Sequence, residues 1–418
     1  MRFIYKLGIQ LYLLLIILVA PFNIKARRWL KGRQGIWRKI RLNIKPGDSV
    51  VWVHCASLGE FEQGRPIIEE IRKTMPEKKV LLTFFSPSGY ELRKNYEGAH
   101  CVTYMPLDTR FNAWRFMNLV KPEMAFFIKY DYWYYFLRTL KKKKIPAYIV
   151  SAKFRRDQVF FKWYGVWYRS VLKFFTVLYV QNEESRRLLH VIGINNVEVT
   201  GDTRFDRVYA ISQRSVEYPW LKPFAEGKKV IIAGSTWEKD EQLLIEYINQ
   251  SGPEIRFILA PHEISEKKLI RIIELIEHPT VRFTDNDKSS YLNAKVLIVD
   301  TIGHLSSLYR YGNIAYIGGG FGKGIHNILE AATYGLPVIM GPNYRKFLEA
   351  VEMIERKAAF SINNYNELKS SFDQLTTDEK LRGNCSALAK SYIESKLGAT
   401  HTIVDRAMRI KPGSNAAG

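Results

Sequence analysis

The chain has 418 residues, which favours two domains of similar size. Hydrophobic residues make up 47% and charged residues 25%, which excludes a mainly disordered chain, a collagen and a polytopic membrane protein. Lys and Arg number 63 against 41 Asp and Glu, and this net charge of +22 predicts an anionic partner: a phosphorylated ligand, an acidic membrane or nucleic acid. The three cysteines are far apart, which argues against a disulfide scaffold or a zinc site and fits a reducing compartment.

The N-terminal segment is apolar from Leu7 to Phe22 and is interrupted only by Gln10. This run is slightly shorter than the ~20 residues that span a bilayer. The residues that follow are strongly basic, with no acid before Asp48, whereas a signal peptide places its positive charge first. We therefore expect a membrane anchor, either a short span or an interfacial segment, with a basic collar on anionic lipid and the bulk of the chain in the cytoplasm. A buried core helix is the competing interpretation.

From Val50 onward, short apolar runs alternate with amphipathic stretches, a pattern that predicts parallel sheets with helices on both faces. In the first half we expect strands at 50–53, 80–83, 124–128, 147–150 and 197–200, with helices at 66–74 and 182–192. In the second half we expect strands at 230–233, 255–260, 296–299, 314–317 and 338–340, with helices at 237–249, 265–276 and 327–334.

The stretch 216–227 separates these halves and carries two prolines and a glycine, which is typical of a linker. The expected organisation is an anchor with its collar at 1–45, a domain at 46–215, the linker at 216–227, a second domain at 228–395, and a final segment at 396–418. Doubly wound domains bind ligands at the carboxyl ends of their strands, so functional motifs should directly follow strands.

The first such motif is His-Cys-Ala-Ser-Leu-Gly-Glu at 54–60. Gly59 permits a tight turn between strand and helix. Glu60 would then lie at the carboxyl edge of the sheet, where a single carboxylate can act as a general base. The competing interpretation is that Glu60 only occupies the first turn of a helix, where the helix dipole favours an acid.

The second motif is Gly-Ser-Thr-Trp-Glu at 234–238, again directly after an expected strand. Ser235 with Glu238 fits a capping box. The functional interpretation is a phosphate held by the N–H groups and hydroxyls of this helix N-terminus, with which the acids of the first turn would compete.

The strongest motif is the segment 318–330, in which five glycines in seven residues precede a helix. Glycine-rich backbone lets a ligand approach closely and offers consecutive N–H donors. The segment is neither the dinucleotide fingerprint nor a P-loop. Asn327 with Glu330 fits a helix cap, but Glu330 is also well placed to accept hydrogen bonds from ribose hydroxyls.

Two histidines are weaker candidates, because a lone histidine is more often structural than a ligand. His262 follows the strand that ends at 260, and His304 follows the strand that ends at 299. No cluster of His, Asp and Glu has the spacing of a metal site, so we expect neither a metal nor another cofactor.

Taken together, the motifs resemble those of the 3-deoxy-D-manno-octulosonic acid (Kdo) transferases of lipid A assembly. The resemblance runs from the apolar N-terminus to about Ser391. The family patterns appear, in order, as His-Ser-x-Ser-x-Gly-Glu at 54–60, Gln-Asn-Glu-Glu at 181–184, Gly/Thr-Ser-Thr-x-x-x-Glu-Glu at 234–241, part of Pro-Arg-His at 261–262, Gly-Gly-His-Asn-Pro-Leu-Glu at 324–330 and Pro-Val-x-x-Gly-Pro at 337–342.

The resemblance implies a GT-B glycosyltransferase, in which two Rossmann-like domains face a cleft. The N-terminal domain would take the lipid acceptor, the C-terminal domain CMP-Kdo, and a helix at 400–409 would cross back to the first domain. The implied reaction is an inverting, metal-independent transfer of Kdo from CMP-Kdo to a lipid A precursor (lipid IVA) in lipopolysaccharide biosynthesis. It would take place on the cytoplasmic side of the inner membrane, on anionic lipid, and no nucleic acid is expected as a partner.

The resemblance also implies the site residues. Glu60 corresponds to the general base that takes a proton from the acceptor hydroxyl. The implied catalytic set is completed by Lys129, Asp131 and Arg204. The implied contacts to CMP-Kdo are Ser235, Thr236, Pro261, His262, Ile302, Gly303, His304, Gly324, Asn327, Ile328, Leu329 and Glu330.

The chain departs from the family pattern at three places. The family's Glu-Thr-Glu-Leu-Trp-Pro reads Lys-Tyr-Asp-Tyr-Trp-Tyr at 129–134, so a carboxylate assigned to the transition state is Lys129 here. The family's Gly-x-x-Lys-Phe-Asp reads Gly-Asp-Thr-Arg-Phe-Asp at 201–206, and the Arg of Pro-Arg-His is His262. These differences predict a branch adapted to a different acceptor.

Two other hypotheses remain open at this point. One keeps the GT-B fold but uses another nucleotide sugar, such as a UDP- or GDP-sugar. The other is a non-catalytic, basic, membrane-associated module. The stretch 154–175 suits the second hypothesis, because aromatic residues interleaved with cations are typical of surfaces that bind nucleic acid or phospholipid.

Overall fold

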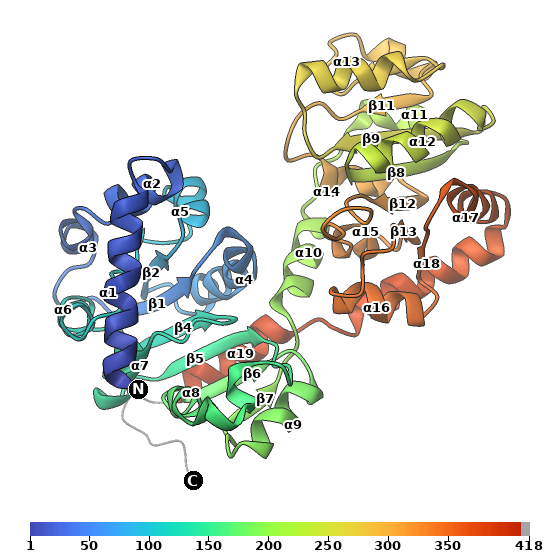
Figure 1. The fold of residues 1–418 in the computed structure, drawn as a ribbon. Helices are drawn as coiled ribbons and strands as arrows, with labels where there is room; N and C mark the ends of the chain where they lie inside the picture. Colours follow the sequence, from blue (N-terminus) through green and yellow to red (C-terminus); the bar gives the residue numbers. More distant parts are fainter. Residues whose placement is uncertain (411–418) are drawn as a thin grey trace. The chain divides into compact units, whose positions relative to one another are not determined.

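The computed structural model describes residues 1–410, apart from the side chain of Lys288, and its chain forms two compact units (Figure 1). Unit 1 contains Met1–Arg207 together with the C-terminal segment from Leu397, and unit 2 contains Val208–Lys396. The part of the expected final segment beyond residue 410 lies outside the described residues.

Unit 1 is built on a seven-stranded parallel sheet with the order β3-β2-β1-β4-β5-β6-β7. Its strands are β1 (Val50–Cys55), β2 (Lys79–Phe84), β3 (Cys101–Tyr104), β4 (Met124–Ile128), β5 (Ala147–Ala152), β6 (Val177–Val180) and β7 (Val197–Val199). Along β1, Trp52 packs into the core on one face, and Val51 and Val53 pack into the core on the other. Burial of both faces explains why the strands are continuous apolar runs.

Helices cover both faces of this sheet. The N-terminal ones are α1 (Arg2–Val19), α2 (Ile24–Gly32) and α3 (Ile36–Asn43). Those between and after the strands are α4 (Leu58–Thr74), α5 (Pro87–Arg93), α6 (Arg110–Val120), α7 (Tyr134–Lys142), the 3-10 turns η1 (Val159–Phe161) and η2 (Trp163–Gly165), α8 (Val166–Leu172) and α9 (Glu183–Val191). Helix α10 (Thr203–Gln213) begins in unit 1 and ends in unit 2.

Unit 2 repeats the plan with the order β10-β11-β9-β8-β12-β13-β14, again all parallel. Its strands are β8 (Lys229–Thr236), β9 (Ile255–Pro261), β10 (Thr280–Arg282), β11 (Val296–Ile298), β12 (Ile314–Ile317), β13 (Val338–Met340) and β14 (Ala359–Ser361). Its principal helices are α12 (Glu238–Gln250), α13 (Glu266–Glu274), α14 (Leu305–Leu308), α15 (Leu329–Thr333), α16 (Leu348–Glu355), α17 (Tyr365–Thr377) and α18 (Glu379–Glu394).

These two parallel-sheet units confirm the predicted α/β class with two Rossmann-like domains. Four strands were not predicted, namely β3, β6, β10 and β14, which have three or four residues each. The boundary between the two units also lies at a different place from the expected linker. The stretch 216–227 lies inside unit 2, where Pro219–Leu221 and Lys222–Ala225 form helical turns and Leu221 and Phe224 are buried. Prolines at the first turn of short helices resemble linker prolines in sequence.

The direction in which strands are added reverses once in each sheet. In unit 1 this point lies between β1 and β4, and in unit 2 between β8 and β12. Ligands of doubly wound sheets bind at such points, outside the carboxyl ends of the strands. Glu60 follows β1 and Asp131 follows β4, whereas the segment 234–238 ends β8 and the glycine-rich segment follows β12.

The C-terminal helix α19 (Ala399–Arg409) belongs to unit 1 and packs against α4. Its buried residues Ile403, Val404 and Ala407 join the core on that face of the sheet. Asp206 caps the helix, because its carboxylate accepts hydrogen bonds from Gly398 N and Thr400 N, both at 2.7 Å. A side chain of unit 1 thus provides the acceptor for N–H groups at the start of α19, which have no acceptor within the helix.

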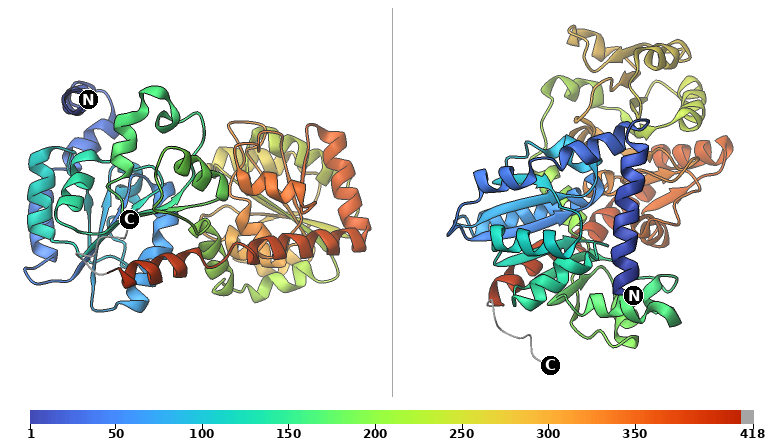
Figure 2. Two further views of the ribbon diagram at one scale, coloured as in Figure 1. Left: turned by 90° about the horizontal axis from the view of Figure 1, so that it is seen from below. Right: turned by 60° about the vertical axis from the view of Figure 1, so that its left-hand side comes forward.

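Helix α1 is the one helix among residues 1–410 that is long and apolar enough to cross a membrane by length and composition. It lies alongside unit 1 (Figures 1 and 2), begins at Arg2 and ends before the turn that contains Pro21. None of its residues is buried, so the interpretation of the apolar run as a core helix is wrong.

The cap on α19 gives a first prediction. Replacing Asp206 by Ala should lower the free energy of unfolding by about 1–2 kcal/mol, because two N–H groups lose their acceptor. Thermal unfolding followed by circular dichroism measures the loss. Asp405→Ala, which removes only a surface ion pair with Arg409 on the same helix, is the matched control and should change little. Equal melting temperatures for the two variants would contradict the capping role.

Candidate active site

Glu60 occupies position N3 of α4, where its side chain turns back onto the start of the helix. Its Oε2 atom accepts hydrogen bonds from Ser57 N at 2.9 Å and Ser57 Oγ at 3.3 Å. The residue is half-buried, and this burial raises the pKa of the Glu60 carboxyl, while the Ser57 N–H and the charge of Lys129 act to lower it. The carboxylate therefore closes a capping box and also remains a partly exposed, titratable group at the switch point.

Lys129 stands directly after β4 in a left-handed conformation, with φ of 60°. Its N–H donates to the Val150 carbonyl on β5 at 2.9 Å, which fixes the turn. A non-glycine residue with this φ is uncommon and costs conformational energy. The turn brings the ammonium group close enough to Glu60 for its charge to favour the ionised carboxylate.

Asp131 is buried beside Glu60 and His54. Burial, together with the charge of Glu60, holds the pKa of Asp131 well above its usual range. Its Oδ2 atom has no hydrogen-bond partner and lies 3.4 Å from His54 Nε2. Burial and the neighbouring Glu60 charge therefore disfavour the ionised form of Asp131, because two adjacent carboxylates resist double ionisation.

His54 is held as a neutral ring. Its Nδ1 lies 2.8 Å from Thr83 Oγ1, and its Nε2 accepts a hydrogen bond from Trp133 Nε1 at 3.1 Å. Complete burial lowers the pKa of His54 to about 3. Because Trp133 donates to Nε2, the ring proton resides on Nδ1, and the contact between His54 and Asp131 is not an ion pair.

Arg204 is positioned by Asp202. The carboxylate of Asp202 accepts from Arg204 Nε at 2.9 Å and from the Arg204 main-chain N at 3.0 Å. It also accepts from Gln63 Nε2 at 2.9 Å and from Gln181 Nε2 at 2.9 Å. This network places one half-buried guanidinium at the carboxyl edge of the first sheet, which fits the predicted role of a cation there.

In unit 2, the turn after β8 is closed by Asp240. This buried carboxylate accepts hydrogen bonds from Trp237 N at 2.9 Å, Gly319 N at 2.8 Å and the Tyr316 hydroxyl at 2.7 Å. The predicted capping box of Ser235 with Glu238 is wrong, because Trp237 is the N-cap and Asp240 is the N3 residue. Asp240 thereby ties the start of α12 to the glycine-rich segment.

The predicted residues Ser235 and Thr236 differ in accessibility. Ser235 is half-exposed and has φ of 55°. The hydroxyl of Thr236 is buried and donates to Glu241 Oε1 at 3.1 Å, so this side chain is already engaged inside unit 2. Thr236 can therefore serve a ligand only through its main chain.

The glycines of the segment 318–324 serve close backbone packing as well as ligand access. A Cβ on Gly320 would lie 2.6 Å from the Gly341 backbone, and Gly319 adopts φ of 89°. Both observations require glycine whether or not a ligand is bound. The segment folds back on itself, because His326 N donates to the Gly318 carbonyl at 3.1 Å.

Three rings stack at the carboxyl edge of the second sheet. His262 stacks on both Trp237 and His326, with centroid distances of 4.5 Å to each, while the centroids of Trp237 and His326 lie 6.4 Å apart. The Trp237 indole N–H donates to His326 Nε2 at 2.9 Å. Burial and the neighbouring His262 lower the pKa of His326, which agrees with its Nε2 accepting the Trp237 hydrogen bond. The stack offers an aromatic surface beside the glycine-rich segment.

The remaining predicted contacts occupy two loops. His304 Nδ1 lies 2.7 Å from the Tyr218 hydroxyl, while Ile302 and Gly303 are exposed. Asn327 is exposed, and its Nδ2 donates to Glu330 Oε1 at 2.9 Å. The structure places Ile328 and Leu329 in the core, so only their main-chain groups can reach a ligand, and α15 begins at 329 rather than 327.

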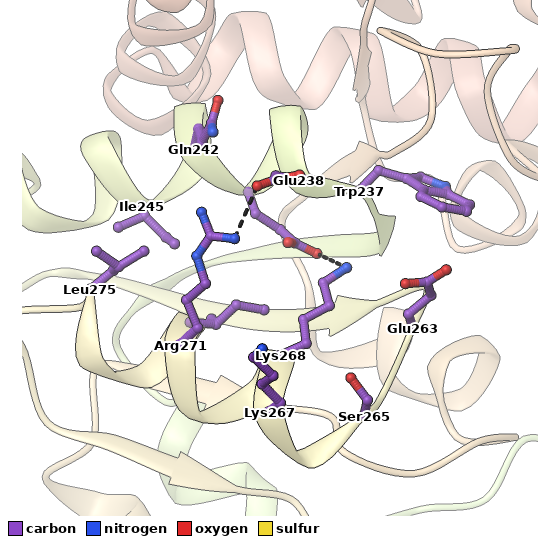
Figure 3. Close-up of a pocket in the computed structure, with 12 residues that line it drawn as sticks. Trp237, Glu238, Gln242, Ile245, Glu263, Ser265, Lys267, Lys268, Arg271 and Leu275 are labelled. Atoms are coloured by element: carbon purple, nitrogen blue, oxygen red, sulfur yellow. Dashed lines mark hydrogen bonds and ion pairs between the residues drawn. The ribbon is translucent and has the colours of Figure 1, made fainter.

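Two cavities flank Trp237. The first, of about 410 Å³, lies between α12 and α13 and is crossed by the ion pairs Lys268–Glu241 at 2.9 Å and Arg271–Glu238 at 3.0 Å (Figure 3). The second, of about 590 Å³, is lined by the glycine-rich segment, Lys239 and Lys323. Among residues 1–410, no group of three or more His, Cys, Asp or Glu side chains is arranged to hold a metal ion.

Comparison with known proteins agrees with the sequence motifs. Residues 28–207 match the family described as 3-deoxy-D-manno-octulosonic-acid transferase (kdotransferase). The chain is 28% identical over 344 residues to the 3-deoxy-D-manno-octulosonic acid transferase of Aquifex aeolicus, covering 81% of this chain and 89% of that protein. It is 26% identical over 404 residues to the enzyme of the same name from Rickettsia bellii, covering 93% and 94%.

The chain is a relative of the Kdo transferases. This finding confirms the resemblance predicted from the motifs, and these relatives indicate a glycosyltransferase enzyme.

Solved structures show the same fold. A UDP-GlcNAc 2-epimerase from Neisseria meningitidis matches with a TM-score of 0.61 at 17% identity, covering 87% of this chain and 100% of that one. MurG from Acinetobacter baumannii matches with a TM-score of 0.56 at 13% identity, with the same coverage. These matches confirm the predicted GT-B fold.

Sequence reasoning missed several residues that build the site of this Kdo-transferase relative. Trp133 was seen only as part of a motif, and its contact with His54 joins strands β1 and β4, which are far apart in the chain. Trp237 and His326 were likewise assigned no role, although both closely follow strand ends. Asp240 was treated as a competitor for an anion, whereas it is a buried acceptor for three donors.

The influence of Lys129 on Glu60 is testable without any substrate. Lys129→Met should raise the pKa of Glu60 further, because the positive charge that now lowers it is removed. NMR titration of the Glu side-chain carboxyl carbons, assigned with Glu60→Gln, measures the shift. Lys141→Met, which replaces an exposed lysine on α7, is the control. An unchanged titration of Glu60 in the Lys129→Met variant would show that this charge does not act on it.

Asp240 gives a prediction on stability. Asp240→Asn replaces an oxygen acceptor by an N–H₂ donor that faces other donors, and should lower the free energy of unfolding by about 2–3 kcal/mol. The control is Glu246→Gln, at an exposed acid on the same helix. Thermal unfolding of both variants measures the loss of stability. Equal melting temperatures for the Asp240→Asn variant and the control would refute the network of three donors around Asp240.

Proposed function

We propose that this chain transfers Kdo from CMP-Kdo to a lipid A precursor (lipid IVA) in lipopolysaccharide biosynthesis, with inversion at the anomeric carbon and Glu60 as general base. The observation that carries the proposal is the half-buried Glu60 carboxylate at the switch point of the first sheet, with a cation beside it. The names of the relatives support the transferred group, Kdo, and the class of reaction.

The chemistry is a single displacement. The acceptor hydroxyl attacks the anomeric carbon of Kdo, its proton passes to the Glu60 carboxylate, and the bond between that carbon and the phosphate oxygen breaks, so that CMP leaves with the electron pair. The leaving group carries a single phosphate. Positioned N–H groups and cations can stabilise it, so the proposal assigns no role to a metal or another cofactor.

Lys129, Asp131 and Arg204 complete the catalytic set in this proposal. Lys129 keeps Glu60 ionised and therefore able to accept a proton. Burial and the charge of Glu60 raise the pKa of Asp131, which disfavours a second negative charge beside Glu60. Arg204, fixed by Asp202, supplies a cation for the charge that develops in the transition state. We propose that Lys129, in place of an acid, marks adaptation to a different acceptor.

Unit 2 would bind CMP-Kdo at the carboxyl ends of its strands. Asn327 and Glu330, hydrogen-bonded to each other, would receive the ribose hydroxyls. The other proposed contacts are Ser235, Pro261, His262, Ile302, Gly303, His304 and Gly324, with Thr236, Ile328 and Leu329 acting through their main chains. The aromatic stack of Trp237, His262 and His326 supports a planar ligand in this region.

The proposed acceptor is an anionic lipid, which agrees with the net charge of +22 and with an apolar N-terminal helix followed by a basic collar. We propose that the protein works on the cytoplasmic side of the inner membrane in contact with anionic lipid, and that nucleic acid is not a partner.

Glu60→Gln tests the base. It should lower the rate of transfer by about 10²–10⁴-fold while CMP binds as before, because only the proton acceptor is lost. Mass spectrometry of a tetra-acylated lipid A precursor after incubation with CMP-Kdo measures turnover. Glu69→Gln, at a half-exposed acid on the same helix paired with Arg65, is the control. Near-normal turnover in the Glu60→Gln variant would refute the assignment.

The pH dependence follows from the direction of the Glu60 shift. A base must be deprotonated, so the rate should fall as pH drops through the pKa of Glu60, and burial places this acid limb above the ordinary value of 4.5. The pH–rate profile of the wild type measures it. A rate that stays constant until the pH is well below that ordinary value would contradict a raised pKa.

Binding of nucleotides to the apo protein separates the proposal from its alternatives. CMP should displace a fluorescent CMP analogue at lower concentration than UDP or GDP does. Preference for UDP or GDP would favour a transferase for another nucleotide sugar. Absence of binding by all of them would favour a non-catalytic membrane module.

A further inference from the structure

The second cavity beside Trp237, with a volume of about 590 Å³, lies within unit 2 and has two walls. One wall is the start of α12, which carries Lys239, and the other is the glycine-rich segment 319–324. The volume is within the range of roughly 300–1,000 Å³ that is typical of small-molecule sites. His326 also lines the cavity, which therefore borders the segment 324–330 in which several of the proposed nucleotide contacts lie. A sugar joined to a nucleotide held by that segment would be next to this cavity.

The acids of this cavity are engaged elsewhere, whereas its lysines are not. Glu238 pairs with Arg271 of α13 at 3.0 Å, in the first cavity (Figure 3). Asp240 is buried, and its two oxygens accept the three hydrogen bonds described above. Lys239 and Lys323 are exposed, and neither forms an ion pair within the described part of the chain. The cavity therefore favours an anionic ligand.

The two cations are carried by a well-packed framework. Lys239 Nζ lies 5.0 Å from the centre of the Phe321 ring, a cation–π contact that holds the ammonium group over the glycine-rich segment. The turn that carries Lys323 is fixed by Asn343, whose Nδ2 donates to the Gly322 carbonyl at 2.8 Å. The backbone of the turn and one of the two ammonium groups are thus positioned before a ligand binds, which lowers the entropic cost of binding.

Trp237 adds an aromatic surface to the same cavity. The residue is 40% exposed, although its indole N–H already donates to His326 Nε2. An exposed indole beside cations suits a sugar, whose C–H groups pack on the ring while its polar groups meet charged partners. A bare inorganic anion would make no use of this surface.

We propose that this cavity is a sugar subsite, which holds the Kdo of the donor, and that Lys239 and Lys323 bind the carboxylate of that sugar. The ligand class is a carboxylated sugar joined to a nucleotide. The motifs that resemble the Kdo transferases do not include these lysines: Lys239 is at a variable position of the pattern at 234–241, and Lys323 precedes the pattern at 324–330. The inference rests on the proposed function, because it takes the donor to be CMP-Kdo.

The position of the carboxylate gives the two lysines a part in specificity. In Kdo the carboxylate is bonded directly to the anomeric carbon, so a cation that holds the carboxylate also helps to place the reacting carbon. A neutral nucleotide sugar carries no such group, and its binding would leave both ammonium groups unpaired. The sugar subsite therefore selects an acid sugar over a neutral one.

Kinetics with uncharged variants test the sugar subsite. Lys239→Met and Lys323→Met should each raise the KM for CMP-Kdo about tenfold, the loss expected for one exposed charge-assisted hydrogen bond, while inhibition by CMP stays as in the wild type. Lys323→Arg keeps the charge and should keep the KM near that of the wild type. The control is Lys267→Met, at an exposed lysine of α13 that lines the first cavity instead of the second. Melting temperatures check that all variants fold.

Binding of free Kdo measures the same contact without turnover. In the full chain saturated with CMP, a titration followed by ligand-observed NMR should show tighter binding of Kdo than of its C1 amide, which has nearly the same shape but no charge. In the Lys323→Met variant the difference between the two ligands should shrink about tenfold, because one of the two cations that distinguish them is gone.

Three outcomes would overturn the assignment. An unchanged KM in both lysine variants would remove the carboxylate from this cavity, and so would equal binding of Kdo and its amide by the wild type. A loss of CMP affinity as large as the rise in KM would place the nucleotide phosphate there instead. The proposed function fails separately, because a wild type that shows no transfer but prefers Kdo to its amide refutes the reaction and keeps the sugar subsite.

Discussion

The arrangement of both candidate sites depends on how the first strand-to-helix turn of each sheet is closed. In each unit an acid at position N3 reaches back to the N-cap amide, Glu60 to Ser57 N at 2.9 Å and Asp240 to Trp237 N at 2.9 Å. A helix N-terminus has N–H groups without internal acceptors, and an acid one turn away both satisfies one of them and complements the helix dipole. The same local device therefore recurs at the switch point of each sheet.

The surroundings give the two acids different uses. Asp240 is enclosed and uses its remaining lone pairs to accept from Gly319 N and the Tyr316 hydroxyl, so it is purely an organiser of the glycine-rich segment. Glu60 remains half-exposed and interacts with the charge of Lys129 and with the buried carboxyl of Asp131. Burial raises the pKa of the Glu60 carboxyl, and an upward shift of this kind is what the proposed general base requires.

A chain of contacts joins the N-terminal helix to the first of these sites. Tyr12 stacks on Phe85, Phe85 on Trp133, and Trp133 donates to His54. Each member comes from a different part of the chain, and none of the pairs is close in sequence. Aromatic rings are suited to such a path, because they bury a large apolar surface while an indole N–H still finds an acceptor. Helix α1 and the carboxyl edge of the first sheet are therefore parts of one packed structure.

The local sequence pattern was sufficient to predict the repeated α/β elements, because a buried strand is a run of consecutive apolar residues. It also placed Glu60, the segment 234–238 and the glycine-rich segment directly after strands. Strands β3, β6, β10 and β14, the division after Arg207 and the cap on α12 were not predicted. A proline at the start of a short helix looks in sequence like a proline in a linker. What only the tertiary structure decided is which distant groups meet: Trp133 with His54, Asp206 with α19, and Tyr5 with Asp108. Parallel sheets bring strand ends together from far apart in the chain, so the raised pKa of Asp131 and the packing of α1 follow from contacts that no local window of sequence contains.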